Sequence, residues 1–246
     1  MDVIGHSSVT SVSLDRGDGR NSIDAAAIGL MEAALIKAEA DPECRVLAIT
    51  SGPGVFSTGM DLTAVGAEEV AEPGGLFFDL LQRFVSSRLL VVVSVDGKTA
   101  GGGMGLVAAA DLVHATPGST FALPEALWGL LPCVVLPFLA RRIGPHRART
   151  MMLTTQPIDV QTAVAWGVVD VAADDLGTAL RPLVFRASKV DAATFADAKR
   201  YASAFDPVTD DDRQRAVAEL RRLLGTRTVR DRLAAFADHG QFPWQA

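Results

Sequence analysis

Cysteine and histidine are scarce in this chain. The two cysteines, Cys44 and Cys133, stand far apart in 246 residues and form neither a disulfide framework nor a metal-ligand spacing. We therefore expect both to be reduced core thiols of a cytoplasmic protein. The histidines are equally scattered, at His6, His114, His146 and His239. The sequence predicts no metal site and no resident cofactor.

Several common signatures are also missing. No apolar stretch reaches the roughly 18 residues that span a bilayer, and the start lacks the pattern of a signal peptide. We therefore expect a soluble chain that has no membrane partner. Neither a phosphate-binding G-x-x-x-x-G-K-[ST] loop nor a G-x-S-x-G nucleophile elbow occurs. These absences argue against P-loop nucleotide chemistry and serine-hydrolase chemistry.

Positive charge is in short supply in the first part of the chain. The net charge of −6 divides into −9 through Ala140 and +3 beyond it. Such an acidic protein is a poor nucleic-acid binder. The basic second part is compatible with an anionic partner, such as a phosphate-bearing thioester carrier, and equally with solvated helix faces.

Glycine is abundant where the chain turns after an apolar run. The run VVVSV at Val91–Val95 predicts a strand buried on both faces. It is followed by the triplet Gly101–Gly103 and a small-residue helix over Met104–Ala110. This turn is open to two interpretations. It either lets a helix pack closely on a sheet, or it presents backbone N–H groups to a developing negative charge.

Strands and helices alternate over most of the chain, which predicts an α/β fold with parallel pairing. We expect strands at Val9–Leu14 and Arg45–Ser51 around a helix over Ala25–Ala40, capped by Ser22 or Asp24. The acidic segment Gly66–Gly75 shows no periodicity and is interpreted as a mobile surface segment or lid. A helix is expected over Leu76–Leu90, and helices dominate from Asp174 onward.

Two loops are predicted to share a function. Phe56–Leu62 (FSTGMDL) and Thr99–Leu106 (TAGGGMGL) both follow buried strands and turn at glycine into a helix start. Neighbouring parallel strands bring such loops together at the carboxyl edge of the sheet. Two backbone N–H groups that converge there form an oxyanion hole, which suits the enolate of a thioester.

Four segments in order resemble the crotonase (enoyl-CoA hydratase/isomerase) superfamily: FSTGMDL, VDGKTAGGGMGL, FALPEALWGLLP and LTTQPIDVQTAVAWGVVD. The resemblance covers about Val9 to Ala172. It implies a crotonase spiral of ββα units over 1–190, a C-terminal helical region over 191–246 that completes homotrimers or hexamers, and thioester substrates. It also implies oxyanion N–H groups on Met60 and Gly102.

One departure from the family pattern narrows the expected chemistry. Typical hydratases carry two glutamates; the second matches Glu125, but the first falls on Gly105. The segment PEALWGLLPCVVLPFLARRIG and the terminal GQFPW resemble polyketide-biosynthesis enoyl-CoA hydratases, in which that first glutamate is likewise missing. This resemblance implies dehydration of a 3-hydroxy-3-methylglutaryl thioester on an acyl carrier protein, which gives a 3-methylglutaconyl thioester. Glu125 would be the single acid–base group, its pKa raised by burial beside Leu123, Leu127 and Trp128.

Other polar residues have more than one interpretation. Asp61 and Asp111 are expected to be structural. Arg141 and Arg142 belong to a basic cluster around His146 that either docks an acidic carrier or is plain surface, and Lys199 is a candidate phosphate ligand. Ser22 completes the predicted substrate- and carrier-binding set.

The alternatives to the dehydratase are another crotonase activity on an acyl-CoA (hydration, isomerisation or decarboxylation) and a catalytically inactive scaffold.

Overall fold

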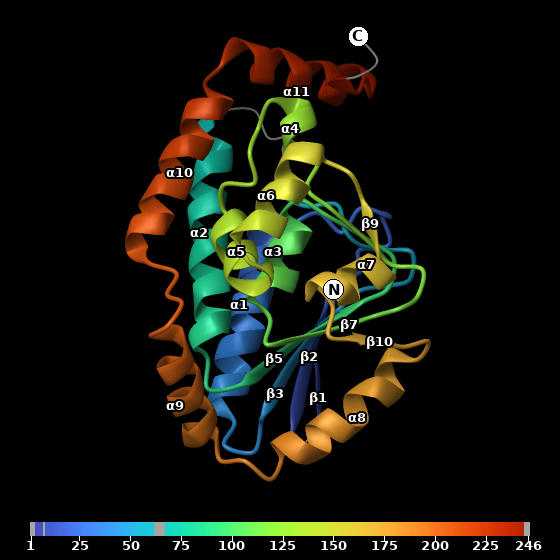
Figure 1. Ribbon diagram of the computed structural model, residues 1–246, viewed down its shortest axis with the longest axis vertical. Helices are drawn as coiled ribbons and strands as arrows, with labels where there is room; N and C mark the ends of the chain where they lie inside the picture. Colours follow the sequence, from blue (N-terminus) through green and yellow to red (C-terminus); the bar gives the residue numbers. More distant parts are fainter. Residues whose placement is uncertain (1–2, 7, 62–66, 244–246) are drawn as a thin grey trace.

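A twisted sheet of mostly parallel strands forms the lower half of the molecule (Figure 1). The computed structural model describes residues 3–6, 8–61 and 67–243. Among the described strands of the large sheet, the outer pair, β1 and β2, is antiparallel, and every other pair of neighbouring strands is parallel. The strands in spatial order are β1 (Val3–His6), β2 (Val9–Ser13), β3 (Val46–Thr50), β5 (Leu90–Val95), β7 (Leu112–Ala115) and β10 (Val171–Ala172).

A second, smaller sheet continues from the carboxyl ends of these strands. Its first three strands are parallel and the last pair is antiparallel. In spatial order they are β4 (Val55–Ser57), β6 (Lys98–Ala100), β8 (Thr120–Ala122) and β9 (Ile158–Asp159). Because β3 leads into β4 and β5 leads into β6, two successive strand–turn–strand units deliver their loops to the same edge.

Helices cover both faces of the large sheet and extend beyond it. They are α1 (Ala25–Ala40), α2 (Ala67–Ser86), α3 (Gly102–Ala109), α4 (Glu125–Trp128), α5 (Leu136–Ile143), α6 (Pro145–Thr154), α7 (Val160–Trp166), α8 (Leu176–Ala187), α9 (Ala192–Ser203), α10 (Asp210–Leu224) and α11 (Arg227–His239). No helix in the described part of the chain combines the length and the apolar character needed to cross a membrane.

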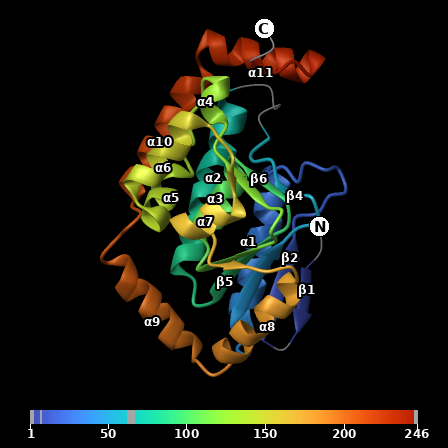
Figure 2. The same cartoon turned by 45° about the vertical axis from the view of Figure 1, so that its right-hand side comes forward.

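Alternation along the strands explains the layers. Val91 and Val93 of β5 belong to the main core with α1, α2 and α3, whereas Val92 faces the other way and packs with α8. Every residue of α3 is buried. Figure 2 shows α8 lying against the sheet on the side away from α2. The strands are therefore covered on both faces, as the β-branched run of β5 predicts.

The segment predicted as a lid is instead helical. Gly66 lies outside the described residues, but Ala67 begins α2, which runs through Pro73 to Ser86. The reason is packing: a Cβ at Gly74 would lie 2.7 Å from a methyl group of Leu220 in α10. The glycines that weaken the helical pattern let α10 approach α2 closely, so tertiary contact outweighs their low helix propensity.

Other local expectations are confirmed. Asp24, rather than Ser22, caps α1 by accepting a hydrogen bond from the Ala27 N–H at 2.8 Å. The chain after Asp174 is helical, and α9 and α10 both pack on α2. The division into a core over 1–190 and a helical region over 191–246 stays a prediction.

Candidate active site

The two glycine loops meet where the sequence predicts. Strands β4 and β6 are parallel neighbours, so the loops after Ser57 and after Ala100 leave the sheet at the same edge. Gly59 has a φ of +99°, and a Cβ there would lie 2.9 Å from the Gly102 nitrogen. Only glycine permits both that backbone conformation and that approach. The glycine therefore brings the two loops into direct contact.

The backbone N–H groups of Met60 and Gly102 are available for a ligand. Ile23 donates to the Gly59 carbonyl at 2.8 Å and accepts from the Asp61 N–H at 3.2 Å, so the Met60 N–H between them points away from that bridge. Gly102 begins α3, and a Cβ on it would stand 3.0 Å from the Met60 nitrogen. Within the described residues neither N–H donates to a protein acceptor. Two adjacent unpaired donors at a helix start can stabilise a negatively charged oxygen.

Glu125 faces the same glycine turn from the opposite side. It is the first residue of α4, a helix of four residues, and a Cβ at Gly101 would lie 3.4 Å from its Oε1. The residue is half-buried, but its Oε2 is inaccessible and has no hydrogen-bond partner among the described residues. A buried carboxylate oxygen without a partner is costly, and such groups gather at functional sites.

Burial sets the protonation of this carboxyl. Desolvation raises the pKa of Glu125 from its ordinary 4.5 to about 7, although a hydrogen bond with its own backbone amide works in the lowering direction. A group with this pKa exchanges protons readily near neutrality, as a general acid or base must. Leu123 is fully buried and Trp128 half-buried, but Leu127 is 38% exposed and contributes less apolar cover than predicted.

These groups open into one cavity of about 340 Å³. Its polar lining includes Ser22, Thr58 and Asp61 beside the glycine turn. Its apolar wall includes Leu130, Leu131, Val134, Val135, Leu220 and Leu233. A largely apolar cavity with a few converging polar groups is the usual form of a small-molecule site.

Aromatic side chains from the C-terminal part close one side of the cavity. The Trp128 ring of α4 meets the Phe236 ring of α11 edge-on, with centroids 5.1 Å apart, and Phe242 contacts both rings. In Figure 1, α11 lies across the top of the molecule, next to α4. The predicted docking of the tail is confirmed for Phe242; Trp244 lies outside the described residues.

Apolar side chains occupy the space around Gly105. A Cβ at this position would lie 3.0 Å from both Leu81 and Phe77 of α2, closer than side chains normally tolerate. Gly105 does not line the cavity. A side chain at this position requires Leu81 and Phe77 to shift, and Glu125 is the one glutamate among the described residues that line the cavity.

Of the predicted binding residues, Ser22 lines the cavity, whereas Arg141, Arg142 and Lys199 do not. Arg141 is half-buried, and its Nε donates to the Asp206 carbonyl at 3.1 Å. Arg142 donates to the carbonyls of Gly167, Val168 and Ala110 and forms an ion pair with Asp170. Carrier binding by these residues stays a prediction. The hydrogen bonds and the ion pair of Arg142 hold neighbouring segments of the fold together.

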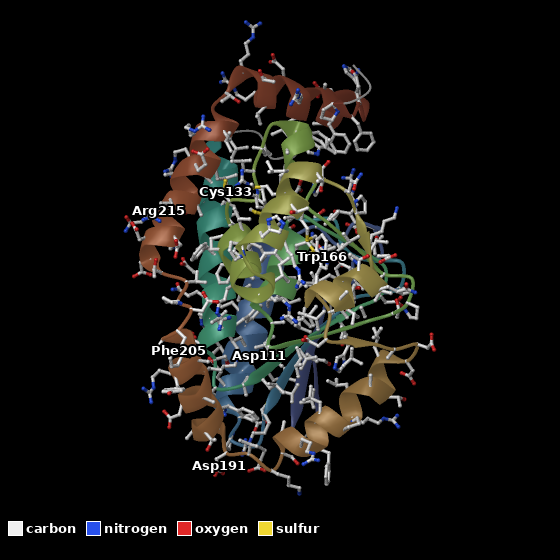
Figure 3. All side chains as sticks on the ribbon, in the orientation of Figure 1. Asp111, Cys133, Trp166, Asp191, Phe205 and Arg215 are labelled. Carbon is white, nitrogen blue, oxygen red and sulfur yellow. The ribbon has the colours of Figure 1, made fainter. Side chains whose placement is uncertain are left out.

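Lys199 is tied into the fold. Its Nζ lies 2.6 Å from Asp111 Oδ2 and donates to the Phe84 and Leu89 carbonyls at 3.0 and 2.7 Å. Asp111 also accepts from the Val91 N–H, which confirms its predicted structural role. In Figure 3, Asp111 lies in the lower half of the view, while Cys133, which lines the cavity, lies in the upper half. The Lys199 ammonium joins α9 to the sheet.

Some site residues escaped prediction. Arg20 lines the cavity from the turn-rich loop before α1, and Phe236 lines it from a helix without any recognisable motif. Cys133 lies in a segment that carries the family resemblance, but it was expected to be a core thiol and not a cavity residue. Arg20 stands two residues before Ser22, but nothing in the sequence marks it apart from other surface arginines. Among the side chains that the structure describes, no three His, Cys, Asp or Glu residues gather as metal ligands.

A strand–helix fold whose glycine loops present two backbone donors to an apolar cavity defines an enzyme of the crotonase class. The family model of enoyl-CoA hydratase/isomerase matches residues 5–246, so the chain belongs to this family of lyases and isomerases. The activity is of the hydratase or dehydratase type, and members of the family need no cofactor beyond the thioester that carries the substrate.

The relatives include several dehydratases. The chain is 30% identical over 205 residues to the bacillaene synthase dehydratase PksH of Bacillus subtilis, covering 81% of this chain and 79% of that protein. It is 34% identical over 174 residues to the carnitinyl-CoA dehydratase of Citrobacter koseri, covering 67% and 64%. The crystal structure of pksH from Bacillus subtilis superposes with a TM-score of 0.89 at 27% identity over 98% of both chains. These matches confirm the predicted crotonase-type α/β fold.

Proposed function

We propose that this chain dehydrates a 3-hydroxy-3-methylglutaryl group on an acyl carrier protein to a 3-methylglutaconyl group during polyketide β-branching. The observation that carries the proposal is the one glutamate among the described residues that line the cavity: Glu125 faces Gly101, and the family resemblance matches the usual first glutamate to Gly105, which packs against α2. The similarity to the bacillaene synthase dehydratase PksH supports the same reading.

The reaction starts at the thioester carbonyl. Its oxygen sits between the N–H groups of Met60 and Gly102, which stabilise the negative charge of an enolate. Removing one such donor typically costs on the order of 3 kcal/mol of transition-state stabilisation. Glu125, as a carboxylate, takes the α-proton, and the C–H electron pair moves into the enolate. This step leaves Glu125 as a neutral acid in the same cavity.

The second step releases water. The enolate collapses, the C–O bond to the tertiary hydroxyl breaks, and Glu125 returns the proton to the departing oxygen. One carboxylate serves both steps because the α-proton and the hydroxyl leave from the same face, and because a tertiary C–O bond breaks more easily than a secondary one. A pKa of about 7 favours both uptake and return of the proton.

The proposal includes the partner, the assembly and the location. The acyl carrier protein would deliver the thioester at the cavity, with Ser22 beside the substrate and the basic residues around Arg141 on the docking face. Homotrimers or hexamers are expected from the family, and the free thiols of Cys44 and Cys133 agree with a cytoplasmic protein.

An assay of the purified chain with two acyl groups tests the proposal. Incubation with 3-hydroxy-3-methylglutaryl-carrier protein should remove one water from the acyl chain, detected by mass spectrometry, while crotonyl-CoA should be hydrated slowly or not at all. Rapid hydration of crotonyl-CoA without reaction of the carrier substrate would favour an acyl-CoA crotonase. No mass change with any substrate would favour a scaffold.

A further inference from the structure

One corner of the cavity is formed by apolar side chains. A Cβ placed on Gly74 of α2 would lie 2.7 Å from Leu220 Cδ2. The same point lies 3.8 Å from Val134 Cγ2 and 3.9 Å from Met60 Cε. The ends of three side chains from separate segments therefore gather around one buried glycine. All three residues line the cavity, whereas Gly74 itself does not. We call Met60, Val134 and Leu220 the apolar corner.

The Met60 side chain connects the apolar corner to the oxyanion donors. Its backbone N–H is one donor, and its Cγ would lie 3.1 Å from a Cβ on Gly102, the residue that supplies the other. From there the side chain runs to the apolar corner, where its methyl group ends near Gly74. The substituents on C3 of an acyl thioester lie about as many bonds from the carbonyl oxygen as this methyl group lies from the Met60 nitrogen. An acyl group held by the two donors therefore brings a C3 substituent to the apolar corner.

The apolar corner suits an uncharged substituent. None of its three side chains can donate a hydrogen bond, and Leu220 and Val134 are buried. Desolvation raises the pKa of the adjacent Cys133 thiol, which also lines the cavity, to about 12, so this wall stays neutral near pH 7. A carboxylate placed here would lose its hydration without gaining a partner, whereas an alkyl group is stabilised by burial.

The packing of α10 on α2 fixes the position of Leu220. Figure 1 shows the two helices side by side along the left of the molecule. Two helical turns before Leu220, and so on the same face of α10, Arg213 donates to both carboxylate oxygens of Asp79 in α2, at 2.5 and 2.8 Å. Gly74 leaves the space into which the leucine fits. Helix packing therefore sets where the apolar corner ends.

We propose that Leu220 determines which C3 substituent the enzyme accepts, by closing the apolar corner beyond a methyl group. This inference rests on the proposed function, whose substrate carries a methyl, a hydroxyl and a carboxymethyl group on C3. The hydroxyl faces Glu125, with which it exchanges a proton, and hydration keeps the charged carboxymethyl group out of the apolar corner. The methyl group then packs against Leu220. A longer alkyl group would meet the leucine and displace the thioester from the oxyanion donors.

Two substrates that differ by one methylene test this size limit: 3-hydroxy-3-methylglutaryl-carrier protein and 3-ethyl-3-hydroxyglutaryl-carrier protein. Leu220→Ala and Leu220→Val enlarge the apolar corner to different extents. Gly74→Ala is expected to narrow it, because the added Cβ forces Leu220 to move. One control, Leu224→Ala, truncates a buried leucine of α10 that does not line the cavity. The other is Gly75→Ala, in which the added Cβ would lie 3.2 Å from the Arg213 guanidinium.

The measured quantity is the preference for methyl over ethyl, expressed as the ratio of the two kcat/KM values. One methylene in an apolar pocket changes such a ratio about 10- to 200-fold, so wild type should prefer the methyl substrate about tenfold or more. Leu220→Ala should remove most of this preference, Leu220→Val should reduce it less, and Gly74→Ala should increase it. Both controls should keep the wild-type ratio. Equal use of both substrates by wild type, an unchanged ratio in both Leu220 variants, or an equal drop in Leu224→Ala overturns the inference.

Binding measurements separate this inference from the proposed function. The probes are 3-methylglutaryl-CoA and 3-ethylglutaryl-CoA, which lack the hydroxyl and cannot lose water, and their Kd values come from calorimetric titration. If wild type binds the methyl probe about tenfold more tightly and Leu220→Ala loses that preference, but no hydroxylated substrate loses water, the size limit stands and the dehydratase fails. If dehydration proceeds and wild type and Leu220→Ala show the same preference, the size limit fails alone.

Discussion

Gly105 of α3 lies directly against Phe77 of α2, so closely that a Cβ on the glycine would stand 3.0 Å from the ring. This contact occupies the position where hydratases of the family carry their first glutamate. The packing of α2 on α3 therefore disfavours any side chain at Gly105.

Gly105→Glu should destabilise the chain without creating a hydratase. Overpacking costs about 1–3 kcal/mol, and a carboxylate forced against Leu81 and Phe77 adds a desolvation cost. We expect the free energy of unfolding, measured by urea titration, to fall by about 3 kcal/mol or more. Gly29→Glu is the matched control, because nothing lies within 4 Å of a Cβ at Gly29 in α1. Equal stability of the two variants would contradict the packing argument.

The activity should depend on one ionisation. Proton abstraction needs Glu125 as a carboxylate, and burial raises its pKa from 4.5 to about 7. Below about pH 7 the neutral form dominates, so kcat/KM should fall about tenfold for each further pH unit and level off above that value. Steady-state rates across pH measure this directly. A profile that stays flat down to about pH 5 would mean that Glu125 is not the base.

The aromatic cluster over α4 should control the environment of Glu125. Phe236→Ala removes the ring that packs edge-on against Trp128, three residues after Glu125. Water would then reach the carboxyl, so the apparent pKa of the pH–rate profile should move down from about 7 toward 4.5 and kcat should fall. Phe205→Ala is the control; Phe205 lies just beyond the end of α9, is 74% exposed and meets the Tyr201 ring edge-on. A pH profile unchanged in Phe236→Ala would exclude this role.

Lys199 should prove structural. Its ammonium pairs with Asp111, and both side chains are largely buried. Burial lowers the pKa of Lys199, while Asp111 works in the raising direction. Lys199→Met leaves Asp111 unpaired and should reduce the free energy of unfolding by about 3–5 kcal/mol.

The double variant Lys199→Met, Asp111→Leu is the control for that loss and should recover most of it. KM for the carrier substrate should stay constant in both variants. A raised KM with unchanged stability would restore the phosphate-binding prediction for Lys199.

Local sequence patterns predicted the strands, turns and helices that carry the site residues. The β-branched run of β5, the glycine triplet and the Asp24 cap each specify their structure through backbone preferences and burial, which act over a few residues. The convergence of the two loops followed from parallel pairing alone. The positions of Met60 and Gly102 were named from the family resemblance, and their proximity is now visible in the contacts between the loops.

What the sequence missed depends on contacts between distant segments. Gly74 weakens the helical pattern of α2, yet it is the place where Leu220 of α10 packs. Arg142 and Lys199 look like free surface cations, but their partners, Asp170 and Asp111, come from other segments. Arg20 lines the cavity beside Thr58 and Phe236, which come from distant segments. Such pairings cannot be derived from local periodicity.

Glu125→Gln tests the central claim most directly. This substitution keeps the shape of the side chain and removes the group that moves the proton. In a single-turnover reaction with 3-hydroxy-3-methylglutaryl-carrier protein, wild type should remove one water from the acyl chain. Glu125→Gln should bind the same substrate with an unchanged Kd and leave its mass unaltered over many wild-type half-times. Loss of water at a comparable rate in Glu125→Gln would contradict the single-carboxylate mechanism.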